Sequence, residues 1–420
     1  MRLPSCFLTL AALPLSALAH PPPGVPAQAQ SFAHEARAVG DHPLEELLGA
    51  VASARVDGWL FCGGEGGDPM AAKLVGLESA VERRWCYLLP PSGEPSLLVA
   101  REDSSLFDKL PGRRLAYHGW RDLDDKWKTL LHGHKRLAVS LARLDAATSE
   151  RLRAAGVTAA SAGDILVQCC ARATPAEWTA HERAALLVES VRDESLKLIN
   201  QRITMGAHAN EFEVQQLATR LLESRGLEAL RPVVVAAGVN TADPNYLPTA
   251  KRSSQINIGD LVVVAINARD RSQPRAPAVD LAWTFLVGDR VPPDEVKAAF
   301  ASLVTARDRA LAVIKSHREK HTPLSGWEVD ALARFTFTES KHVEHALLPL
   351  GRSLLANGPA LDDTDTRDER QIVPHTAYAI IPSLFVSGAF GVRTSIDIYL
   401  GDEEVLTSGH PQSAIENLKP

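Results

Sequence analysis

The sequence has no excess of positive charge. Its 420 residues include 45 Lys and Arg against 51 Asp and Glu, which gives a net charge of -6 at pH 7, and no basic stripe runs along it. Proteins that bind nucleic acids generally carry clustered positive charge, because they neutralise phosphates. We therefore expect no nucleic-acid partner.

The chain also lacks an N-terminal apolar run long enough to cross a membrane, which takes about 20 residues. The apolar run at residues 6–15 follows Arg2 and precedes Ala17-Leu18-Ala19, a small-residue cleavage site. We predict a signal peptide at residues 1–19 and a flexible, Pro-rich lead-in at residues 20–40. The mature protein is then exported, either periplasmic or secreted, with no membrane span. The alternative is a frayed apolar N-terminus.

Cysteine is scarce. The chain has five, and Cys6 falls in the predicted signal peptide. The mature chain would keep Cys62, Cys86, Cys169 and Cys170. Their spacing matches no zinc-binding motif. An exported protein could form disulfides between some of them, while small buried hydrophobic residues are the alternative. The sequence leaves the pairing open.

A chain of this length exceeds the usual size of one hydrophobic core, so two domains are expected. Between residues 41 and 172, short apolar segments such as 59–61 and 86–89 alternate with segments of helical spacing, which is typical of an α/β domain. Thr174-Pro175-Ala176-Glu177 is a capping box with proline at the first helical position. A long helix and a second domain, residues 173–420, are predicted to begin there.

Three segments of the second domain follow one another in a distinctive order. They are Gly-Val-Asn-Thr-Ala-Asp-Pro-Asn-Tyr-Leu-Pro-Thr at 238–249, Ile-Gly-Asp-Leu-Val-Val-Val at 258–264 and Val-Asp-Leu-Ala-Trp-Thr-Phe at 279–285. This order resembles the pita-bread superfamily of Xaa-Pro aminopeptidases, prolidases, methionine aminopeptidases and creatinase. The resemblance covers essentially the whole mature chain. It implies a homodimer and an α+β fold, in which a creatinase-like α/β domain precedes an antiparallel sheet covered by two helix pairs.

The metal ligands of those relatives are mostly missing here. Most members of the superfamily hold two divalent metals with two Asp, one His and two Glu. By the resemblance, Asp280 is the one ligand that is kept, and the other four places hold Ala265, Pro349, Ile381 and Ser395. Hard cations depend on several anionic oxygens. We therefore expect no metal cofactor, and the alternative is a divalent Mn, Co or Zn ion held by an atypical ligand set.

Other motif positions are partly kept. His345 takes the place of a histidine that assists proton transfer in the relatives, and Asn245 replaces the substrate-contacting histidine beside Tyr246. The cleft is therefore expected to bind a ligand through Asn245, Tyr246, Arg393, Ser395 and Ile381. Without metals, Asp280 needs a new cationic partner, which Arg393 or Arg352 could supply.

Three functions are compatible with this pattern. The first is a pseudo-peptidase that binds a peptide-like or small ligand without hydrolysing it, and we favour it. The second is a metal-independent hydrolase or lyase of creatinase type, in which His345 and Asp280 are catalytic, as a base and its orienting partner, with Tyr246 as a donor. The third is an active Xaa-Pro aminopeptidase-like metallopeptidase with an atypical ligand set. The fold by itself does not decide among them.

Overall fold

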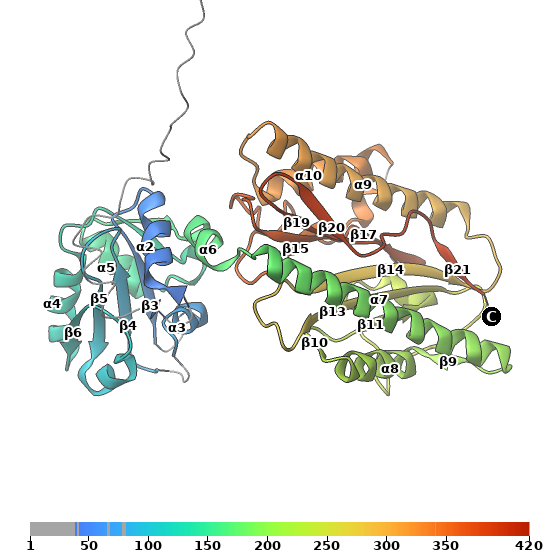
Figure 1. Ribbon diagram of the computed structural model, residues 1–420, viewed down its shortest axis with the longest axis horizontal. Coiled ribbons are helices and arrows are strands. Elements are labelled where there is room, and N and C mark those ends of the chain that lie inside the picture. The colour runs from blue at the N-terminus through green and yellow to red at the C-terminus, as the bar shows by residue number, and fades with distance from the viewer. Residues whose placement is uncertain (1–37, 40–41, 65–67, 78–80, 341, 420) are drawn as a thin grey trace, which may run out of the picture. The chain divides into compact units, whose positions relative to one another are not determined.

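The computed structural model describes residues 38–39, 42–64, 68–77, 81–340 and 342–419 (Figure 1). The predicted signal peptide lies outside these residues, as does the lead-in apart from residues 38–39. Within the described ranges, no helix is long and apolar enough to span a membrane. The chain divides into two compact units between Ala160 and Ser161, somewhat before the expected boundary at residue 172.

The first unit is built on a mixed sheet. Among its described residues the strand order is β6-β5-β4-β3-β7-β8. The strands are β3 (Gly58–Gly63), β4 (Trp85–Leu89), β5 (Ser96–Ala100), β6 (Arg113–Tyr117), β7 (Arg136–Val139) and β8 (Thr158–Ser161). Every residue of β4 and β5 is buried. Strands covered on both faces read as continuous apolar runs, which is why the sequence shows them as such.

Helices and short pieces complete this unit. They are β1 (Ala38–Val39), β2 (His42–Pro43), α2 (Leu44–Ser53), α3 (Pro69–Leu74), η1 (Arg101–Phe107), α4 (Trp120–Leu131), η2 (Leu141–Arg143) and α5 (Ala146–Ala154). Cys62 and Cys86 face each other in the register of β3 and β4 and form a disulfide, with Cα atoms 4.2 Å apart. One pairing that the sequence left open is thereby assigned.

The second unit contains one mainly antiparallel sheet, one antiparallel sheet and smaller pairs. In the first sheet β10 (Leu227–Ala229) and β11 (Val234–Ala237) pair with β13 (Leu261–Asp270), which pairs with β14 (Val279–Val287), and β21 (Glu416–Leu418) lies parallel to β14. The second sheet has the order β15 (Gly351–Ser353), β16 (Ala377–Ile380), β19 (Ile396–Leu400) and β20 (Val405–Ser408). The small pairs are β9 (Ala209–Asn210) with β12 (Gln255–Ile256), and β17 (Ser383–Val386) with β18 (Phe390–Arg393).

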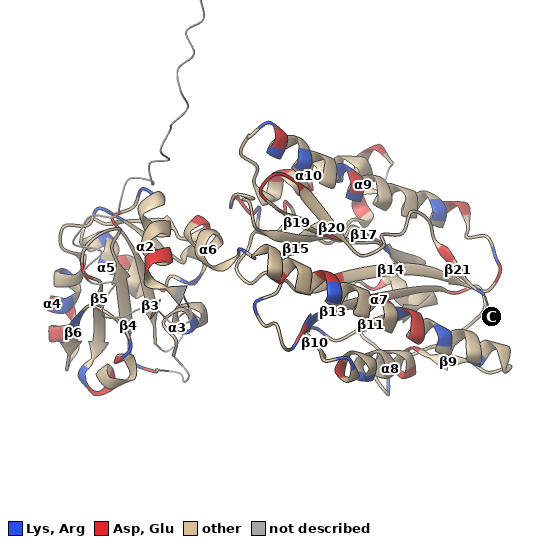
Figure 2. Cartoon of the chain, in the orientation of Figure 1, with Lys and Arg blue, Asp and Glu red and all other residues tan. Residues whose placement is uncertain are grey.

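Two helix pairs cover these sheets, as the resemblance implies. One pair is α7 (Pro175–Thr204) and α8 (Glu211–Ser224), and the other is α9 (Asp294–Glu319) and α10 (Gly326–Glu339) (Figure 1). The short helical pieces are α6 (Gly163–Cys170), η3 (Gly238–Ala242) and η4 (Val343–His345). Basic and acidic positions are interspersed along α8, α9 and α10 (Figure 2).

The start of α7 confirms the capping-box prediction. The Thr174 side chain accepts a hydrogen bond from the backbone of Glu177, and the Glu177 side chain accepts one from the backbone of Thr174. Buried residues of α7 and α8 form one apolar core with the inner faces of β13 and β14. Separate apolar clusters pack α9 and α10 against β17–β18 and the second sheet. Apolar packing against the two helix pairs therefore holds the sheets in position, and these sheets carry the residues of the site described below.

Candidate functional site

The β13–β14 hairpin forms the framework of the site. One face of β13 packs into the core beneath α7 and α8 through Val262, Val264 and Ile266. Side chains alternate along a strand, so Ala265 and Asn267 lie on the opposite face, where both are only half-buried. Asn267 pairs in register with Asp280 of β14. We call Ala265, Asn267, Asp280 and the side chains that surround them the Asp280 site.

Asp280 has an arginine as its partner. Its side chain is buried, and Nε of Arg352 on β15 donates a hydrogen bond to its Oδ2 at 2.5 Å. A buried carboxylate is costly unless it is paired and hydrogen-bonded. The expectation that Asp280 finds a new cationic partner is therefore met by Arg352, one of the two candidates.

Arg393, the other candidate, lies close by but makes different contacts. Its Nη2 donates to the carbonyl oxygen of Pro244 at 3.2 Å, and its guanidinium group lies 5.0 Å from the ring centre of Phe385. Burial and the positive charge of Arg352 lower its pKa to about 10, against an opposing pull from the Asp280 charge. Arg352 therefore bonds to the Asp280 carboxylate, while Arg393 feels only the charge of that carboxylate.

A third arginine, Arg231, belongs to the same group of charges. It lies in the segment between β10 and β11, directly after Leu230, whose N–H donates to the carbonyl oxygen of Asn267 at 2.9 Å. Burial, followed by the charge of Arg352, lowers the pKa of Arg231, and the charge of Asp280 opposes this. No hydrogen bond or ion pair joins Arg231 to another residue in the described part of the chain.

The segment that runs from β18 into β19 is fastened to β14 by side chains. Thr284 Oγ1 accepts from the N–H of Arg393 at 2.9 Å, and Ser395 Oγ accepts from the N–H of Ala282 at 2.7 Å. Ser395 is 3% exposed. Its hydroxyl is therefore committed to the backbone of β14, and the prediction that it binds substrate has no support in this geometry.

Asp397 is a second buried carboxyl group in the site, and its side chain also bonds to the backbone of β14. Its Oδ2 accepts from the N–H of Asp280 at 2.9 Å, while Oδ1 has no hydrogen-bond partner among the described residues. Burial and the nearby Asp280 charge raise the pKa of Asp397 well above its ordinary value of 3.8. Burial and the Asp280 charge thus both favour the protonated, uncharged form of Asp397.

His181 of α7 lies behind Asp397. Its Nε2 is 3.7 Å from Asp397 Oδ2, beyond hydrogen-bond distance, and its Nδ1 is 3.2 Å from the carbonyl oxygen of Pro277. The ring is fully buried and stacks on Trp178. Burial lowers the pKa of His181 to about 4, so the imidazole is neutral near pH 7.

These residues do not fit a pair of divalent metal ions. The side chains of Ala265, Pro349 and Ile381 carry no donor atom, and the hydroxyl of Ser395 is held by the backbone. The Asp280 carboxylate already binds a guanidinium group, and Oδ2 of Asp397 already accepts the backbone N–H of Asp280. Among the described residues, no three His, Cys, Asp or Glu side chains are grouped as metal ligands. The residues of this site therefore support no chemical step through a metal ion.

His345 and Asp280 are not in hydrogen-bond contact. His345 lies in η4, where its Nε2 is 3.5 Å from Glu344, and its side chain is about a quarter exposed. The Asp280 carboxylate is engaged by Arg352 instead. The structure therefore does not show the base and orienting partner that the second hypothesis requires. The catalytic role of the two residues stays a prediction.

Tyr246 and Asn245 also differ from their expected roles. The hydroxyl of Tyr246 donates to Glu211 Oε2 at 2.5 Å, and burial raises its pKa. This hydroxyl is therefore engaged within the fold, and its role as a donor toward a ligand stays a prediction. Asn245 is exposed, and its backbone N–H donates to Asp243. Ile381 is half-buried.

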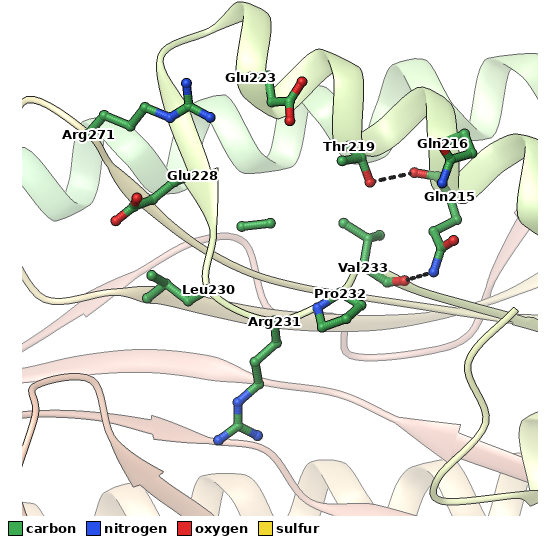
Figure 3. Close-up of a pocket in the computed structure, with 11 residues that line it drawn as sticks. Gln215, Gln216, Thr219, Glu223, Glu228, Leu230, Arg231, Pro232, Val233 and Arg271 are labelled. Carbon is green, nitrogen blue, oxygen red and sulfur yellow. Dashed lines mark hydrogen bonds between the residues drawn. The ribbon is translucent and has the colours of Figure 1, made fainter. Parts of the chain in front are cut away.

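A pocket of about 460 Å³ lies beside the site, between α8 and the β10–β11 segment. Figure 3 shows Glu223 and Arg271 at its rim and Gln215 bonded to the carbonyl oxygen of Val233. The side chain of Arg231 points away from these residues, toward the C-terminal strands. Arg231 is thus shared by the pocket wall and the Asp280 site, while the other pocket residues belong to a separate surface.

The comparisons with known proteins agree with this architecture. Residues 179–402 match the model of metallopeptidase family M24, which is more than half of the chain. The chain therefore belongs to metallopeptidase family M24. A search of curated proteins found no match.

Solved structures show the same fold at low sequence identity. The dipeptidase PepE from Mycobacterium ulcerans matches with a TM-score of 0.66 and 19% identity, over 90% of this chain and 97% of that one. The Xaa-Pro dipeptidase from Bacillus anthracis matches with a TM-score of 0.60 and 19% identity, over 89% and 98%. The N-terminal domain of the FACT complex subunit SPT16 from Cicer arietinum matches with a TM-score of 0.59 and 10% identity, over 87% and 96%. These likenesses establish a two-domain pita-bread fold.

Sequence reasoning missed three residues of the site. Asp397 is a single acid inside an otherwise apolar strand, a position that costs stability unless it has a function or a partner. That signal could have drawn attention to it. His181 lies on the buried face of a helix, where a structural histidine looks the same. Arg231 has no local signal, because its contact with the site depends on how β10 and β11 pair with β13.

Proposed function

We propose that this M24-family protein is a non-metallated pseudo-peptidase, which binds a peptide-like or small ligand at the Asp280 site without hydrolysing it. The observation that carries the proposal is the contact between Arg352 Nε and Asp280 Oδ2 at 2.5 Å. A guanidinium group thereby satisfies the one carboxylate that the metal-binding relatives would use. The FACT subunit domain among the solved structures is also not named as a peptidase.

Electrostatics supports the absence of metals. A divalent cation at Asp280 would have to displace Arg352 and would face the charges of Arg393 and Arg231, which act on the same carboxylate. Like charges at short range repel strongly where water is excluded. Because four ligand positions carry no free donor, nothing compensates this repulsion. The site therefore favours the arginine over the metal.

The arrangement also disfavours hydrolysis without a metal. General base catalysis needs a basic group within hydrogen-bond reach of an attacking water and a second group that orients it. His345 makes its contact with Glu344, and the hydroxyl of Tyr246 is bonded to Glu211. Asp280 is neutralised by Arg352. No observation favours the hydrolase or lyase over the binding protein.

Export and a dimeric state are part of the proposal. The disulfide between Cys62 and Cys86 supports export, because such bonds persist in oxidising compartments outside the cytosol. Mass spectrometry of the mature protein from a fractionated host should show cleavage after Ala19. Recovery of the uncleaved chain from the cytosol would contradict export.

Light scattering after gel filtration tests the dimer. A monomer mass at micromolar concentration would contradict the dimeric state.

Metal analysis tests the central point. The purified protein is incubated with Mn²⁺, Co²⁺ or Zn²⁺, gel-filtered and examined by inductively coupled plasma mass spectrometry. The proposal predicts well under one ion per chain for each metal. Two ions per chain, lost when Asp280→Asn is introduced, would establish a metallopeptidase site and overturn the proposal.

A cleavage assay tests the remaining point. Xaa-Pro dipeptides such as Ala-Pro and Leu-Pro are incubated with the protein, with and without added Mn²⁺, and free proline is measured. No turnover is expected. Asp280→Asn is the matched control, because contaminating peptidases survive it. Cleavage that follows the protein through gel filtration and disappears in Asp280→Asn would show that the chain is an enzyme.

A further inference from the structure

We propose that Arg231, Arg352 and Arg393 form a binding site for a compact oxyanion, the carboxylate or phosphate group of a small ligand. The inference rests on the proposed function, since it takes the Asp280 site to hold no metal ion. It deepens that function by naming the chemical class of the ligand. We call these three residues the arginine cluster.

The three residues of the arginine cluster come from segments that are distant in sequence and that all lie beside the β13–β14 hairpin. Arg352 bonds to Asp280 directly, and the N–H of Arg393 bonds to Thr284 on the same face of β14. Arg231 follows Leu230, which is hydrogen-bonded to Asn267, the register partner of Asp280. The guanidinium group of Arg352 and the backbone at Arg393 and Leu230 are therefore bonded to the β13–β14 hairpin beside the Asp280 site.

The cluster has more hydrogen-bond donors than the protein uses. A guanidinium group carries five N–H donors. Arg352 uses its Nε for Asp280, and Arg393 uses an Nη2 donor for the carbonyl oxygen of Pro244. The guanidinium group of Arg231 has no hydrogen-bond partner in the described ranges. Most donors of the cluster thus have no acceptor among the described residues.

The charges of the cluster are not balanced by the protein. Asp280 brings one carboxylate to it through the hydrogen bond with Arg352. The nearby Asp243 and Glu228 pair with Arg252 at 2.9 Å and with Arg269 at 2.5 Å. The cluster therefore holds three guanidinium groups and one carboxylate that is hydrogen-bonded to it, while Asp243 and Glu228 are already paired with other residues.

Such an excess of positive charge is costly unless an anion offsets it. Burial is the main cause of the lowered pKa values of Arg231 and Arg393, and the Arg352 charge adds to both. Arginine forks match carboxylate and phosphate oxygens bidentately, and such charge-assisted bonds are about twice as strong as neutral ones. A bound oxyanion would satisfy the free donors and the charge together.

The side chains beside the cluster indicate what else the ligand carries. The ring of Phe385 lies under the Arg393 guanidinium group, and Ala265 and Ile381 are half-buried and apolar. An organic body next to the oxyanion would contact these groups. The ligand class is therefore a small molecule or short peptide with an apolar body and one carboxylate or phosphate.

Titration calorimetry in the presence of EDTA tests the inference with defined probes. The probes are inorganic phosphate, the dipeptide Leu-Pro and the C-terminal amide of Leu-Pro, each measured at constant ionic strength set with sodium chloride, because screening weakens charge-dependent binding. We expect phosphate or the free dipeptide to bind and the amide not to bind. Preference between phosphate and the dipeptide tells which oxyanion the site takes.

Arg231→Gln is the informative variant. Its side chain is exposed and has no partner in the described part of the chain, so the substitution removes one charge without disturbing the core. Binding should weaken about tenfold. Arg271→Gln is the matched control, because Arg271 is an exposed arginine at the neighbouring pocket rim that is not part of the cluster. It should bind as the unchanged protein does.

The outcomes separate this inference from the proposed function. If none of the probes binds, or if Arg231→Gln and Arg271→Gln weaken binding equally, the oxyanion site is wrong even though the protein holds no metal. If oxyanion binding requires added Mn²⁺ and disappears in EDTA, the anion is held by metal ions, and the proposed function fails with it. Binding in EDTA that Arg231→Gln weakens selectively supports both.

Discussion

Two buried carboxylates of the second unit, Glu211 and Asp280, differ in how many hydrogen bonds the protein donates to them. Glu211 at the start of α8 accepts hydrogen bonds from the backbone of Ala237 and Ser254, and from the side chains of Asn240 and Tyr246. Asp280 accepts one side-chain hydrogen bond, from Arg352, in an environment crowded with arginine. The first carboxylate is fully satisfied by the protein. The second is surrounded by donors that have no acceptor.

This difference distinguishes a structural site from a binding site. Buried polar groups are normally hydrogen-bonded, and exceptions call for an explanation. Around Glu211 the network is closed, because it joins the start of α8 to β11 and to the segment before β12. Around Asp280 the network is open, with free guanidinium donors and, among the described residues, an unpartnered Oδ1 on Asp397. We infer that the first site stabilises the fold and that the second awaits a ligand.

The largest effect is expected at the closed network. Glu211→Ala leaves several buried donors unsatisfied, and removing one member of such a network costs roughly 3–5 kcal/mol. Chemical denaturation followed by tryptophan fluorescence measures the loss. Glu213→Ala on the same helix is the control, because Glu213 forms a half-exposed ion pair with Arg202 and should cost less than about 1 kcal/mol. Equal losses would show that Glu211 is not the centre of a network.

A smaller effect is expected when Arg352 is removed. Arg352→Ala leaves Asp280 buried without its partner, which should cost roughly 2–3 kcal/mol. Adding Asp280→Asn removes the unpaired charge, so the double variant should recover most of that loss in the same denaturation experiment. Additive losses in the double variant would show that the two side chains do not stabilise each other.

The pH dependence of stability separates His181 from Asp397. Between pH 6.5 and about 4 the unfolded chain protonates His181 while the folded chain does not, so stability falls as the pH falls. Asp397 acts in the other direction. Its folded-state pKa lies well above 3.8, so its contribution is lost as the pH rises from there.

Asp397→Asn removes one of these two opposing contributions. The stability of this variant should therefore rise more steeply between pH 4 and pH 6.5 than that of the unchanged protein, by up to about 1.4 kcal/mol per pH unit. Denaturation curves at several pH values measure both slopes. Parallel slopes would contradict a protonated Asp397 in the folded chain.

The smallest effect is expected at Tyr246. Tyr246→Phe removes one donor from Glu211, but the backbone of Ala237 and Ser254 still bonds to this carboxylate. The loss should be about 1–2 kcal/mol, and binding at the Asp280 site should be unchanged. Reduced binding of phosphate or of Leu-Pro by this variant would show that Tyr246 takes part in ligand recognition after all.

Much of the fold was predictable because its signals are local. The capping box at Thr174 predicted the start of α7, and the motif order around Asp280 predicted the family and its two helix pairs. The division between the units was less accessible, since it depends on contacts rather than on a composition change.

The site was predictable only for those residues that lie within a single sequence motif. The family resemblance predicts that Ala265 and Ile381 stand at ligand positions and that Asp280 needs a cationic partner, and Arg352 supplies that partner. The contact between Asp397 and Asp280 joins residues 117 positions apart, and Arg231 reaches the site through strand pairing. The structure shows the hydroxyls of Tyr246 and Ser395 engaged inside the fold, so the binding roles expected for them stay predictions.

One measurement tests the central claim most directly. Crystals grown with excess Mn²⁺ and measured at a wavelength where manganese scatters anomalously report both the metal and its competitor. We predict no anomalous peak beside Asp280, with Nε of Arg352 within hydrogen-bond distance of the carboxylate. Two strong peaks next to Asp280, with Arg352 turned away, would contradict the account.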